Sequence, residues 1–228
     1  MGIVRRTKSE VARDLPEKRV ADLPVELDDE VGRSIRAAEA EVGRRLAHQY
    51  RRLEAAQEVS YVPPGQLDMD LLRKVALAEL ESSRNAKSGD NVFTMVRRIG
   101  QAKAALAADY TAQLVRSAGK VVFFAKHIDV MDTAEDMLAE AGLRTVSVRG
   151  DQTGKARQEA IDAFQNDPGV SVAICSLTAA GVGLNLHAAS NVVLAELSWT
   201  AAEQEQAIDR VHRIGQDEPV TAWRIIAA

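Results

Sequence analysis

Gln206, Arg210 and Arg213 are the residues in this sequence whose types and spacing most clearly permit chemistry. They are spaced at i, i+4 and i+7 in a segment predicted to form a short helix followed by a glycine turn, so they would share one helical face. A guanidinium keeps its charge and binds oxygens in pairs, which suits phosphoryl groups. Arginines brought against a γ-phosphate are the finger device of nucleoside triphosphatases. Taken alone, the pair also fits a solvated charged helix face.

The same segment carries apolar residues that would anchor the helix to a core. Ile208, Val211 and Ile214 recur at intervals of three residues, on a different stripe from the arginines. An anchored helix would hold the two arginines in a fixed register. We therefore expect the packing face and the arginine face to be separate.

Residues 204–216, QEQAIDRVHRIGQ, closely resemble the last helicase motif of the Swi/Snf-type DNA translocases, a branch of helicase superfamily two. The resemblance is long and specific. It implies that Arg210 and Arg213 are arginine fingers and that Gln206 helps to place a nucleotide. It also implies ATP and Mg²⁺ as cofactors and DNA as a partner.

Composition and charge bound the class of protein. A chain of 228 residues, 46% hydrophobic and 27% charged, can bury a full core in one or two domains. The net charge of −4 gives no global signal for nucleic acid, so any DNA contact must come from a local patch. The single cysteine, Cys175, excludes an internal disulfide and a cysteine-based zinc site. It lies in an apolar run, where we expect a small core residue rather than a nucleophile.

Residues 1–119 comprise a linker, an edge strand and a helical region, and nothing in the helical region suggests catalysis by itself. Residues 5–18 are basic and interrupted by proline, as a linker would be, and they resemble the segment that joins the two lobes of Swi/Snf-type motors. Alternation of apolar and polar residues over 21–28 predicts a strand, and Pro24 places it at a sheet edge because proline cannot donate to the ladder. Apolar residues that recur every three or four positions then predict helices at 29–59, 67–80 and 92–114.

These three helices are most simply an all-α insertion, the protrusion of a second motor lobe. Within the third helix, residues 97–103 (RRIGQAK) resemble a motif of the annealing-helicase branch of the family. We therefore divide the chain into a linker with an edge strand at 1–28, a helical protrusion at 29–119 and a RecA-like lobe at 120–228.

The hydrophobic period changes at residue 120. Short apolar runs predict strands at 121–125, 144–148, 170–175, 192–195 and 220–226. Helices are predicted between them, at 127–141, 153–165 and 200–213. Strands that alternate with helices predict an α/β fold whose parallel sheet is covered on both faces, and the resemblance makes it a RecA-like helicase lobe. Ligands of such sheets bind at the carboxyl ends of the strands.

Basic residues near two strand ends are candidates for DNA contacts. Lys126 follows the first strand of the lobe, where it is either an ordinary surface residue or, by resemblance, a contact to the DNA backbone. Residues 150–164 resemble the Gly-x-Thr-x-x-x-Arg…Phe element of the family. There Thr153 is well placed as an N-cap, and a helix N-terminus flanked by Arg149 and Lys155 favours a phosphate. The alternative is a capped surface helix.

A second specific resemblance covers residues 176–186, SLTAAGVGLNL. Glycines that follow a buried strand allow close approach of a ligand to the backbone. The resemblance implies that Thr178 and Gly181 face the DNA backbone. It also implies that Gly183 and Asn185 approach the nucleotide. Without the resemblance, an ordinary glycine turn fits equally well.

Glu196 and Trp199 stand where the family commonly has Asp-x-x-Trp followed by Asn-Pro. Glutamate at the first position is typical of the annealing-helicase branch. Thr200 and Ala201 replace Asn-Pro, which leaves the turn less rigid. Trp199 is equally compatible with a plain core position.

The sequence lacks the phosphate-binding half of a motor. It holds no Gly-x-x-x-x-Gly-Lys-[Ser/Thr] motif and no Asp-Glu-x-His-type motif, and GDQTGKA at 150–156 is one residue too short for a P-loop. Without them there is no cradle for the β- and γ-phosphates and no carboxylate for Mg²⁺. We expect ATP and Mg²⁺ to be held mainly by an N-terminal P-loop lobe, in cis or in trans, and no metal site in this chain. The chain would be the second lobe, as a fragment of a motor or a split gene product.

The predicted function is that of the C-terminal lobe of an ATP-dependent double-stranded DNA translocase of the annealing-helicase type, inactive without its partner lobe. It would act on double-stranded or forked DNA, away from membranes, in the cytoplasm with the nucleoid of a prokaryote or in the nucleus of a eukaryote. A non-hydrolysing DNA- or protein-binding adaptor is the alternative that the missing motifs favour, whereas intact Gln206, Arg210 and Arg213 favour a motor. The helical insertion and the sequence HRIGQ at 212–216 argue against an RNA-helicase lobe.

Overall fold

The computed structural model describes residues 15–27, 29–56, 66–85, 92–179, 183–198 and 200–228. The described residues up to Glu26 form one compact unit with those from Gly100 onward, and residues 27–99 contribute the second unit. The division passes through helix α4 (Val92–Ala118), because the second half of this helix packs on the sheet. The sequence analysis assigned all of α4 to the protrusion and placed the domain boundary at residue 119. That boundary stays a prediction.

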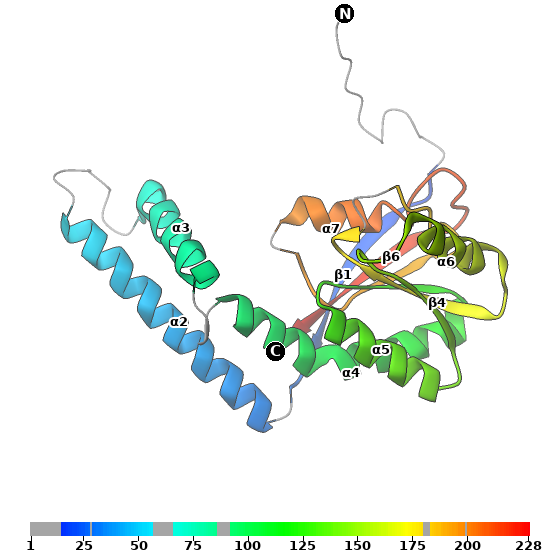
Figure 1. The fold of residues 1–228 in the computed structure, drawn as a ribbon, viewed down its shortest axis with the longest axis horizontal. Coiled ribbons are helices and arrows are strands. Elements are labelled where there is room, and N and C mark those ends of the chain that lie inside the picture. The colour runs from blue at the N-terminus through cyan, green and yellow to red at the C-terminus, as the bar shows by residue number, and fades with distance from the viewer. Residues whose placement is uncertain (1–14, 28, 57–65, 86–91, 180–182, 199) are drawn as a thin grey trace, which may run out of the picture. The chain divides into compact units, whose positions relative to one another are not determined.

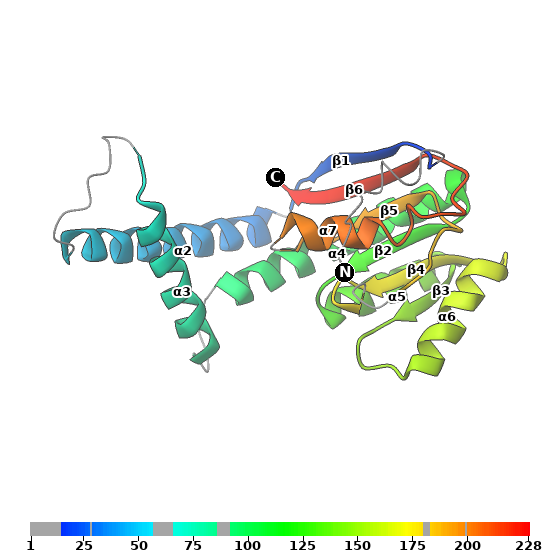
Figure 2. The ribbon, with the colours of Figure 1, turned by 90° about the horizontal axis from the view of Figure 1, so that it is seen from above.

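The first unit is built on a six-stranded sheet with the order β1-β6-β5-β2-β4-β3 (Figure 1, Figure 2). Every neighbouring pair is parallel. The strands are β1 (Lys18–Val25), β2 (Val121–Ala125), β3 (Arg144–Val148), β4 (Val170–Ser176), β5 (Asn191–Leu194) and β6 (Val220–Ala227). The predicted α/β class with a parallel sheet is therefore confirmed, with each strand within three residues of its expected bounds.

Helices cover both faces of this sheet, as predicted. The second half of α4 and α5 (Ile128–Glu140) lie on one face, and α6 (Gly154–Asn166) and α7 (Ala201–Ile208) lie on the other (Figure 1). The continuous apolar run of β2 follows from this arrangement, because successive side chains of a strand point to opposite faces. Phe123 belongs to the core under α4 and α5, whereas Phe124 belongs to the core under α6 and α7, and both side chains are fully buried.

Strand β1 forms one edge of the sheet, where the sequence placed it. Among the described strands it pairs with β6 alone, and Pro24 lies opposite Ile226. An edge position tolerates this proline because only one side of the strand needs ladder hydrogen bonds. Cys175 of β4 is fully buried and burial raises the pKa of its thiol, so it is a core residue as expected.

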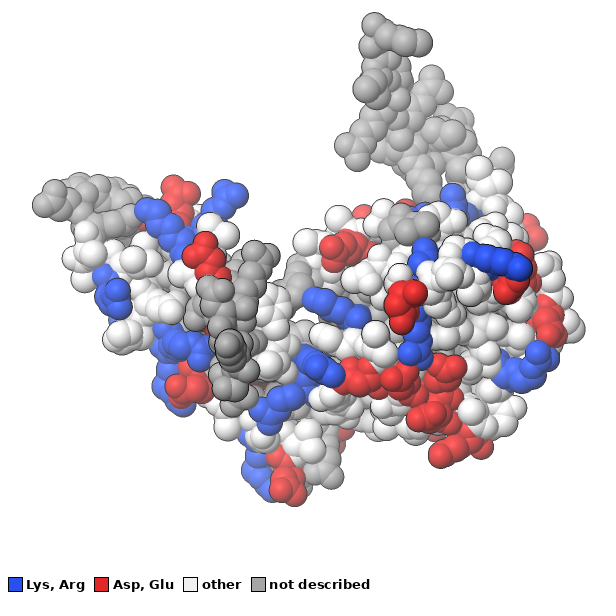
Figure 3. Space-filling view, in the orientation of Figure 1, with Lys and Arg blue, Asp and Glu red and all other residues white. Residues whose placement is uncertain are grey.

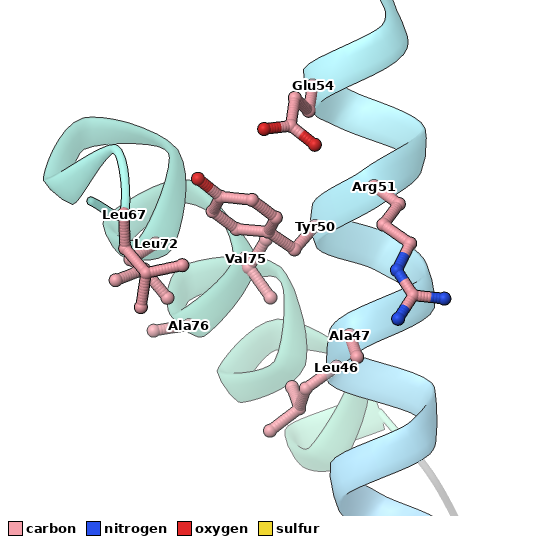
Figure 4. Close-up of a pocket in the computed structure, with 9 residues that line it drawn as sticks. All are labelled: Leu46, Ala47, Tyr50, Arg51, Glu54, Leu67, Leu72, Val75 and Ala76. Atoms are coloured by element: carbon pink, nitrogen blue, oxygen red, sulfur yellow. The ribbon is translucent and has the colours of Figure 1, made fainter. Parts of the chain in front are cut away.

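Helices α2 (Asp29–Ala56) and α3 (Met69–Asn85) form the second unit with the first half of α4, so all three predicted helices are confirmed. Asp68 sets the start of α3, because its carboxylate accepts the N–H groups of Asp70 and Leu71. The N–H of Asp68 in turn donates to the Tyr50 hydroxyl of α2, at 2.9 Å. Tyr50 also lines an apolar hollow of about 460 Å³ between these helices (Figure 4).

Lys120 closes the C-terminal end of α6. Its ammonium group donates to the carbonyls of Phe164, Asp167 and Val170, at 2.5, 2.7 and 2.9 Å, and lies 5.1 Å from the centre of the Phe164 ring. Helix C-termini leave carbonyls without intrahelical partners and carry a partial negative charge, which a cation offsets. Lys120 thereby joins the start of β2 to α6 and β4.

We expect Lys120→Met to lower the free energy of unfolding by about 1–3 kcal/mol, because three carbonyls lose one charged donor. Lys155→Met is the matched control, since the Lys155 side chain is 87% exposed and an exposed substitution changes stability by about 0.5 kcal/mol or less. Urea titration of both variants followed by circular dichroism measures the difference. Equal midpoints for the two variants would contradict the assigned role of Lys120.

Candidate functional site

Helix α7 is shorter than predicted. It begins after Thr200, whose hydroxyl accepts the Glu203 N–H, and it ends at Ile208 rather than near Arg213. Beyond Ile208 the N–H groups of Arg210 and Val211 donate to carbonyls three residues earlier, which is the bonding of tight turns. The prediction that the helix runs to residue 213 is wrong, and so Gln206, Arg210 and Arg213 do not share one regular helical face.

A hydrogen bond from outside the helix accompanies this change. The carbonyl of Arg210 accepts the N–H of Leu186, at 3.0 Å, instead of an N–H further along its own helix. The apolar stripe changes with it: Ile208 and Val211 are buried as predicted, but Ile214 is 85% exposed. Gly215 then takes φ +97°, a left-handed conformation that favours glycine, so the predicted glycine turn is present.

Residues 209–216, here called the arginine segment, are joined to residues 183–189, here called the glycine loop. Besides the bond to Leu186, the guanidinium of Arg213 donates to the Leu184 carbonyl at 3.0 Å. The side-chain amide of Gln216 donates to two further carbonyls of the loop, at 3.1 and 2.7 Å. The two most specific motifs of the sequence therefore form one hydrogen-bonded substructure.

The two arginines lie close enough to influence each other. Burial lowers the pKa of Arg210, the charge of Arg213 lowers it further, and Asp209 opposes the shift. Two guanidinium groups that repel each other in a half-buried place would be stabilised by an anion. A phosphate is one anion of this kind.

The remaining nucleotide candidates lie in or beside these segments. Gly183 and Asn185 belong to the glycine loop and are exposed. A Cβ on Gly183 would meet no described atom within 4 Å, so the space beside its backbone is open to a ligand as far as those residues show. The Asn185 side-chain oxygen lies 2.8 Å from the His187 ring. Gln206, on α7, is exposed and points to a different place.

That place is a small hollow of about 110 Å³ at the carboxyl ends of the central strands. It is lined by Lys126, Leu177, Thr178, Ser198, Glu203 and Gln206. Lys126 follows β2, Thr178 follows β4 and Ser198 follows β5, and these strands are neighbours in the sheet. The structure thus brings together two predicted DNA-binding residues and one predicted nucleotide-binding residue.

The candidates fall into two groups at opposite ends of the sheet. The hollow lies at the carboxyl ends of strands. The arginine segment lies at the amino end, because Asp209 forms an ion pair with Lys18 at 3.4 Å and the His212 ring bonds the Pro16 carbonyl at 2.7 Å. The expectation that ligands bind at the carboxyl ends therefore applies to the hollow and not to the arginines. Helix α7 connects the two groups.

The predicted phosphate site at the start of α6 is present only in part. Thr153 is the N-cap of α6, as predicted, and its hydroxyl accepts the Ala156 N–H. Lys155 is exposed and lies 3.8 Å from Glu159. Arg149, however, pairs with Asp132 and Glu135 of α5, at 2.7 and 2.8 Å. Its role as a DNA contact stays a prediction, and it would require exchange of these partners.

Two of the predicted features cannot be placed in the structure. Gly181 and Trp199 are outside the described ranges. On the face shown in Figure 3, lysines and arginines alternate with acidic residues and do not merge into one basic surface. The described parts of the chain hold no cluster of three His, Cys, Asp or Glu side chains that could bind a metal ion. No described helix has the length and apolar character needed to cross a membrane.

Sequence reasoning missed the position of Glu196. This carboxylate is 2% exposed and accepts the N–H groups of Lys126 and His127, both at 2.8 Å, while the His127 ring lies 2.6 Å from its other oxygen. The available signal was an acidic residue that directly continues the apolar run of β5. Such a residue must be buried, and a buried carboxylate needs donors.

A parallel sheet with helices on both faces, an arginine pair bound to a glycine loop and basic residues at strand ends together define the second lobe of a helicase motor. The chain belongs to the family described as the helicase conserved C-terminal domain, whose model matches residues 102–215, half of the chain.

Within this family, the similar proteins include ATP-dependent helicases. An uncharacterized ATP-dependent helicase of Mycoplasma pneumoniae is 30% identical over 99% of this chain and 20% of its own length. The human DNA annealing helicase and endonuclease ZRANB3 is 35% identical over 60% of this chain and 13% of its own length. This chain therefore spans a fifth or less of these curated relatives.

The fold is shared with two solved Swi/Snf-type ATPases. The C-terminal part of the Fun30 ATPase domain matches with a TM-score of 0.61 and 17% identity, over 93% of this chain and 86% of that one. The Sulfolobus solfataricus SWI2/SNF2 ATPase core, solved in complex with double-stranded DNA, matches with a TM-score of 0.57 and 22% identity, over 99% of this chain and 44% of that one. The predicted resemblance to the Swi/Snf-type family is confirmed.

Proposed function

We propose that this chain is the C-terminal motor lobe of an ATP-dependent double-stranded DNA translocase that remodels or anneals DNA. The observation that carries the proposal is the bonding of the arginine segment to the glycine loop. It places a repelling arginine pair beside the exposed Gly183 and Asn185, while the hollow at the other end of α7 holds Lys126 and Thr178. One helix thus separates a site suited to phosphates from a site suited to a nucleic-acid backbone.

At the nucleotide, Arg210 and Arg213 would stabilise the charge that develops on the γ-phosphate. ATP would lie between this lobe and a P-loop lobe supplied in cis or in trans. Gly183 and Asn185 would help to place it. Gln206 lines the hollow at the other end of α7, so its predicted contact with the nucleotide would require the nucleotide to reach that end of the helix. We assign the ligands of Mg²⁺ mainly to the partner lobe, which would carry the acidic motif that this sequence lacks.

At the DNA, Lys126 and Thr178 would contact the backbone from the end of the sheet, and Arg149, Thr153 and Lys155 from the start of α6. Gly181, outside the described residues, is a further proposed contact. The structure of the archaeal relative in complex with double-stranded DNA supports duplex DNA as the partner. Among the three basic residues proposed to contact DNA, the side chain of Lys155 is the most exposed, and Lys126 lines the hollow. These two lysines therefore make the clearest test.

We expect the double variant Lys126→Ala/Lys155→Ala to bind duplex DNA more weakly at all sequences. The slope of log affinity against log salt should fall in magnitude by about 1.8, since each neutralised phosphate adds about 0.9. Fluorescence anisotropy at several salt concentrations measures both quantities. Lys74→Ala, an exposed lysine of α3, is the matched control and should leave the slope unchanged. An unchanged slope in the double variant would reject the DNA contacts.

A further inference from the structure

Glu196 binds the backbone just before α5 from outside the helix. The N-cap residue of α5, His127, makes no capping bond with its own side chain. Glu196, which follows β5, instead accepts the N–H groups of Lys126 and His127 with one oxygen and contacts the His127 ring with the other. A carboxylate at this end of a helix is favoured by the exposed N–H groups and the helix dipole.

The other side of the same carboxylate rests on Gly100 of α4. A Cβ at position 100 would lie 2.8 Å from Glu196 Cδ and 3.1 Å from Cγ, and closer still to an oxygen. Glycine costs about 1 kcal/mol in a helix interior relative to alanine, so its presence here calls for a packing reason. The close approach of Glu196 provides that reason.

Lys103, one turn further along α4, offsets the buried charge. Its side chain is nearly as buried as Glu196, and its ammonium group donates to the Ile225 carbonyl at 2.5 Å. Burial lowers the pKa of Lys103 to about 8, and the nearby charge of Glu196 opposes this shift. Glu196 therefore packs directly on Gly100 and lies within electrostatic range of Lys103, 93 positions earlier in the sequence.

Glu196 connects the two walls of the hollow. One wall is Lys126, whose backbone N–H is bound by Glu196. The other wall begins at Ser198, two residues after Glu196, and continues into α7 with Glu203 and Gln206. A shift of Glu196 would therefore move Lys126 relative to α7.

We propose that Glu196 is a positioning residue that sets Lys126 for backbone contact with duplex DNA and ties this contact to the segment leading into α7, with Gly100 as its required counterpart. The inference rests on the proposed DNA contact of Lys126. It adds two residues, Gly100 and Glu196, that touch neither DNA nor nucleotide. Glu196 acts through Lys126, so its removal has no further effect once Lys126 is gone.

Glu196→Gln tests this directly, because the amide keeps the shape but removes the negative charge, so its one remaining oxygen holds the N–H groups of Lys126 and His127 more weakly. In duplex-DNA titrations of the 228-residue chain, Glu196→Gln should lower the salt slope by about 0.9, as Lys126→Ala does. The double variant Glu196→Gln/Lys126→Ala should fall no further than Lys126→Ala alone. The NMR amide signals of Lys126 and His127 should shift with it, because the acceptor of both N–H groups changes from a carboxylate to an amide oxygen.

The role of Gly100 is tested by asking whether a shorter side chain at position 196 restores a Gly100→Ala variant. Gly100→Ala should weaken DNA binding and lower the melting temperature, whereas Gly100→Ala/Glu196→Asp should restore both, because aspartate is one methylene shorter. Gly43→Ala in α2 is the control, since a Cβ there meets no described atom within 4 Å and alanine favours the helix. Comparison of Gly100→Ala with Gly43→Ala separates the packing contact from the general effect of a glycine substitution.

The outcomes separate the inference from the proposed function. If Lys126→Ala leaves the salt slope unchanged, the DNA contact itself fails. If Lys126→Ala lowers it but folded Glu196→Gln does not, or if the effects of the two add, the positioning role is overturned. If Glu196→Gln and Gly100→Ala do not fold, the rescue variant decides: recovery of folding and DNA affinity supports the proposal, and absence of recovery overturns it.

Discussion

Replacing Arg213 with alanine, in a motor that joins this lobe to a P-loop lobe, is expected to lower the DNA-stimulated kcat by about 10³-fold or more, the scale of an arginine finger. The affinity for ATP should change much less, because the guanidinium acts mainly on charge that develops in the transition state. Arg213→Lys should not restore the rate, since an ammonium group cannot reproduce a planar pair of donors. Steady-state kcat and KM for the three proteins test this expectation.

The structure adds a stability term to this experiment. Arg213 also donates to the Leu184 carbonyl, so alanine removes one hydrogen bond of about 1 kcal/mol and slightly lowers the melting temperature. Ile214→Ala is the matched control, because this neighbouring side chain is 85% exposed and should affect neither kcat nor melting. A normal kcat in Arg213→Ala would reject the finger role. A collapsed fold would make Arg213 a structural residue of the glycine loop.

The chain alone is expected to hydrolyse no ATP, with or without duplex DNA, whereas addition of a matching P-loop lobe should produce turnover. The reason is the missing P-loop and the missing acidic motif, without which the β- and γ-phosphates have no cradle. A steady-state assay at saturating ATP measures it. The chain with Arg213→Ala serves as a control for contamination, because a contaminant is insensitive to this substitution. Turnover of about 1 s⁻¹ or more that survives repurification and falls in Arg213→Ala would overturn the half-motor proposal. Turnover in the two-lobe mixture would in turn exclude the adaptor alternative.

Most of the fold was predictable because local patterns and tertiary packing agree. The five buried residues of β2 form a short unbroken apolar run, which is typical of a strand covered on both faces. Pro24 excluded a central position for β1, and Thr153 marked the start of α6. In each case one residue type has one physical meaning, whatever lies elsewhere in the chain.

The end of α7 was not predictable for the opposite reason. The spacing of Val211 and Ile214 continues the apolar pattern of a helix beyond Ile208, but the Arg210 carbonyl is bound by Leu186, and only the folded chain reveals that partner. The same limit applies to the site. The sequence suggested that the Arg149 guanidinium would be available to a phosphate. In the structure it forms ion pairs with two acidic residues of α5, more than ten positions away. The roles of the arginines came from resemblance, whereas the function of Glu196 depends on partners about 70 and 96 positions distant, a separation at which sequence patterns carry no signal.

The edge position of β1 has a mechanical consequence. Strands β1 and β6 run parallel, so the amino end of β1 and the carboxyl end of β6 lie at opposite ends of one ladder of eight paired positions (Figure 2). Tension applied between those two ends loads the whole ladder in shear, and its hydrogen bonds resist together instead of opening one at a time. The bond between Pro16 and His212 and the ion pair between Lys18 and Asp209 sit where such a force enters. Tension on the chain before β1 would therefore load the contacts with the arginine segment first, and the hydrogen bonds between β1 and β6 only afterwards.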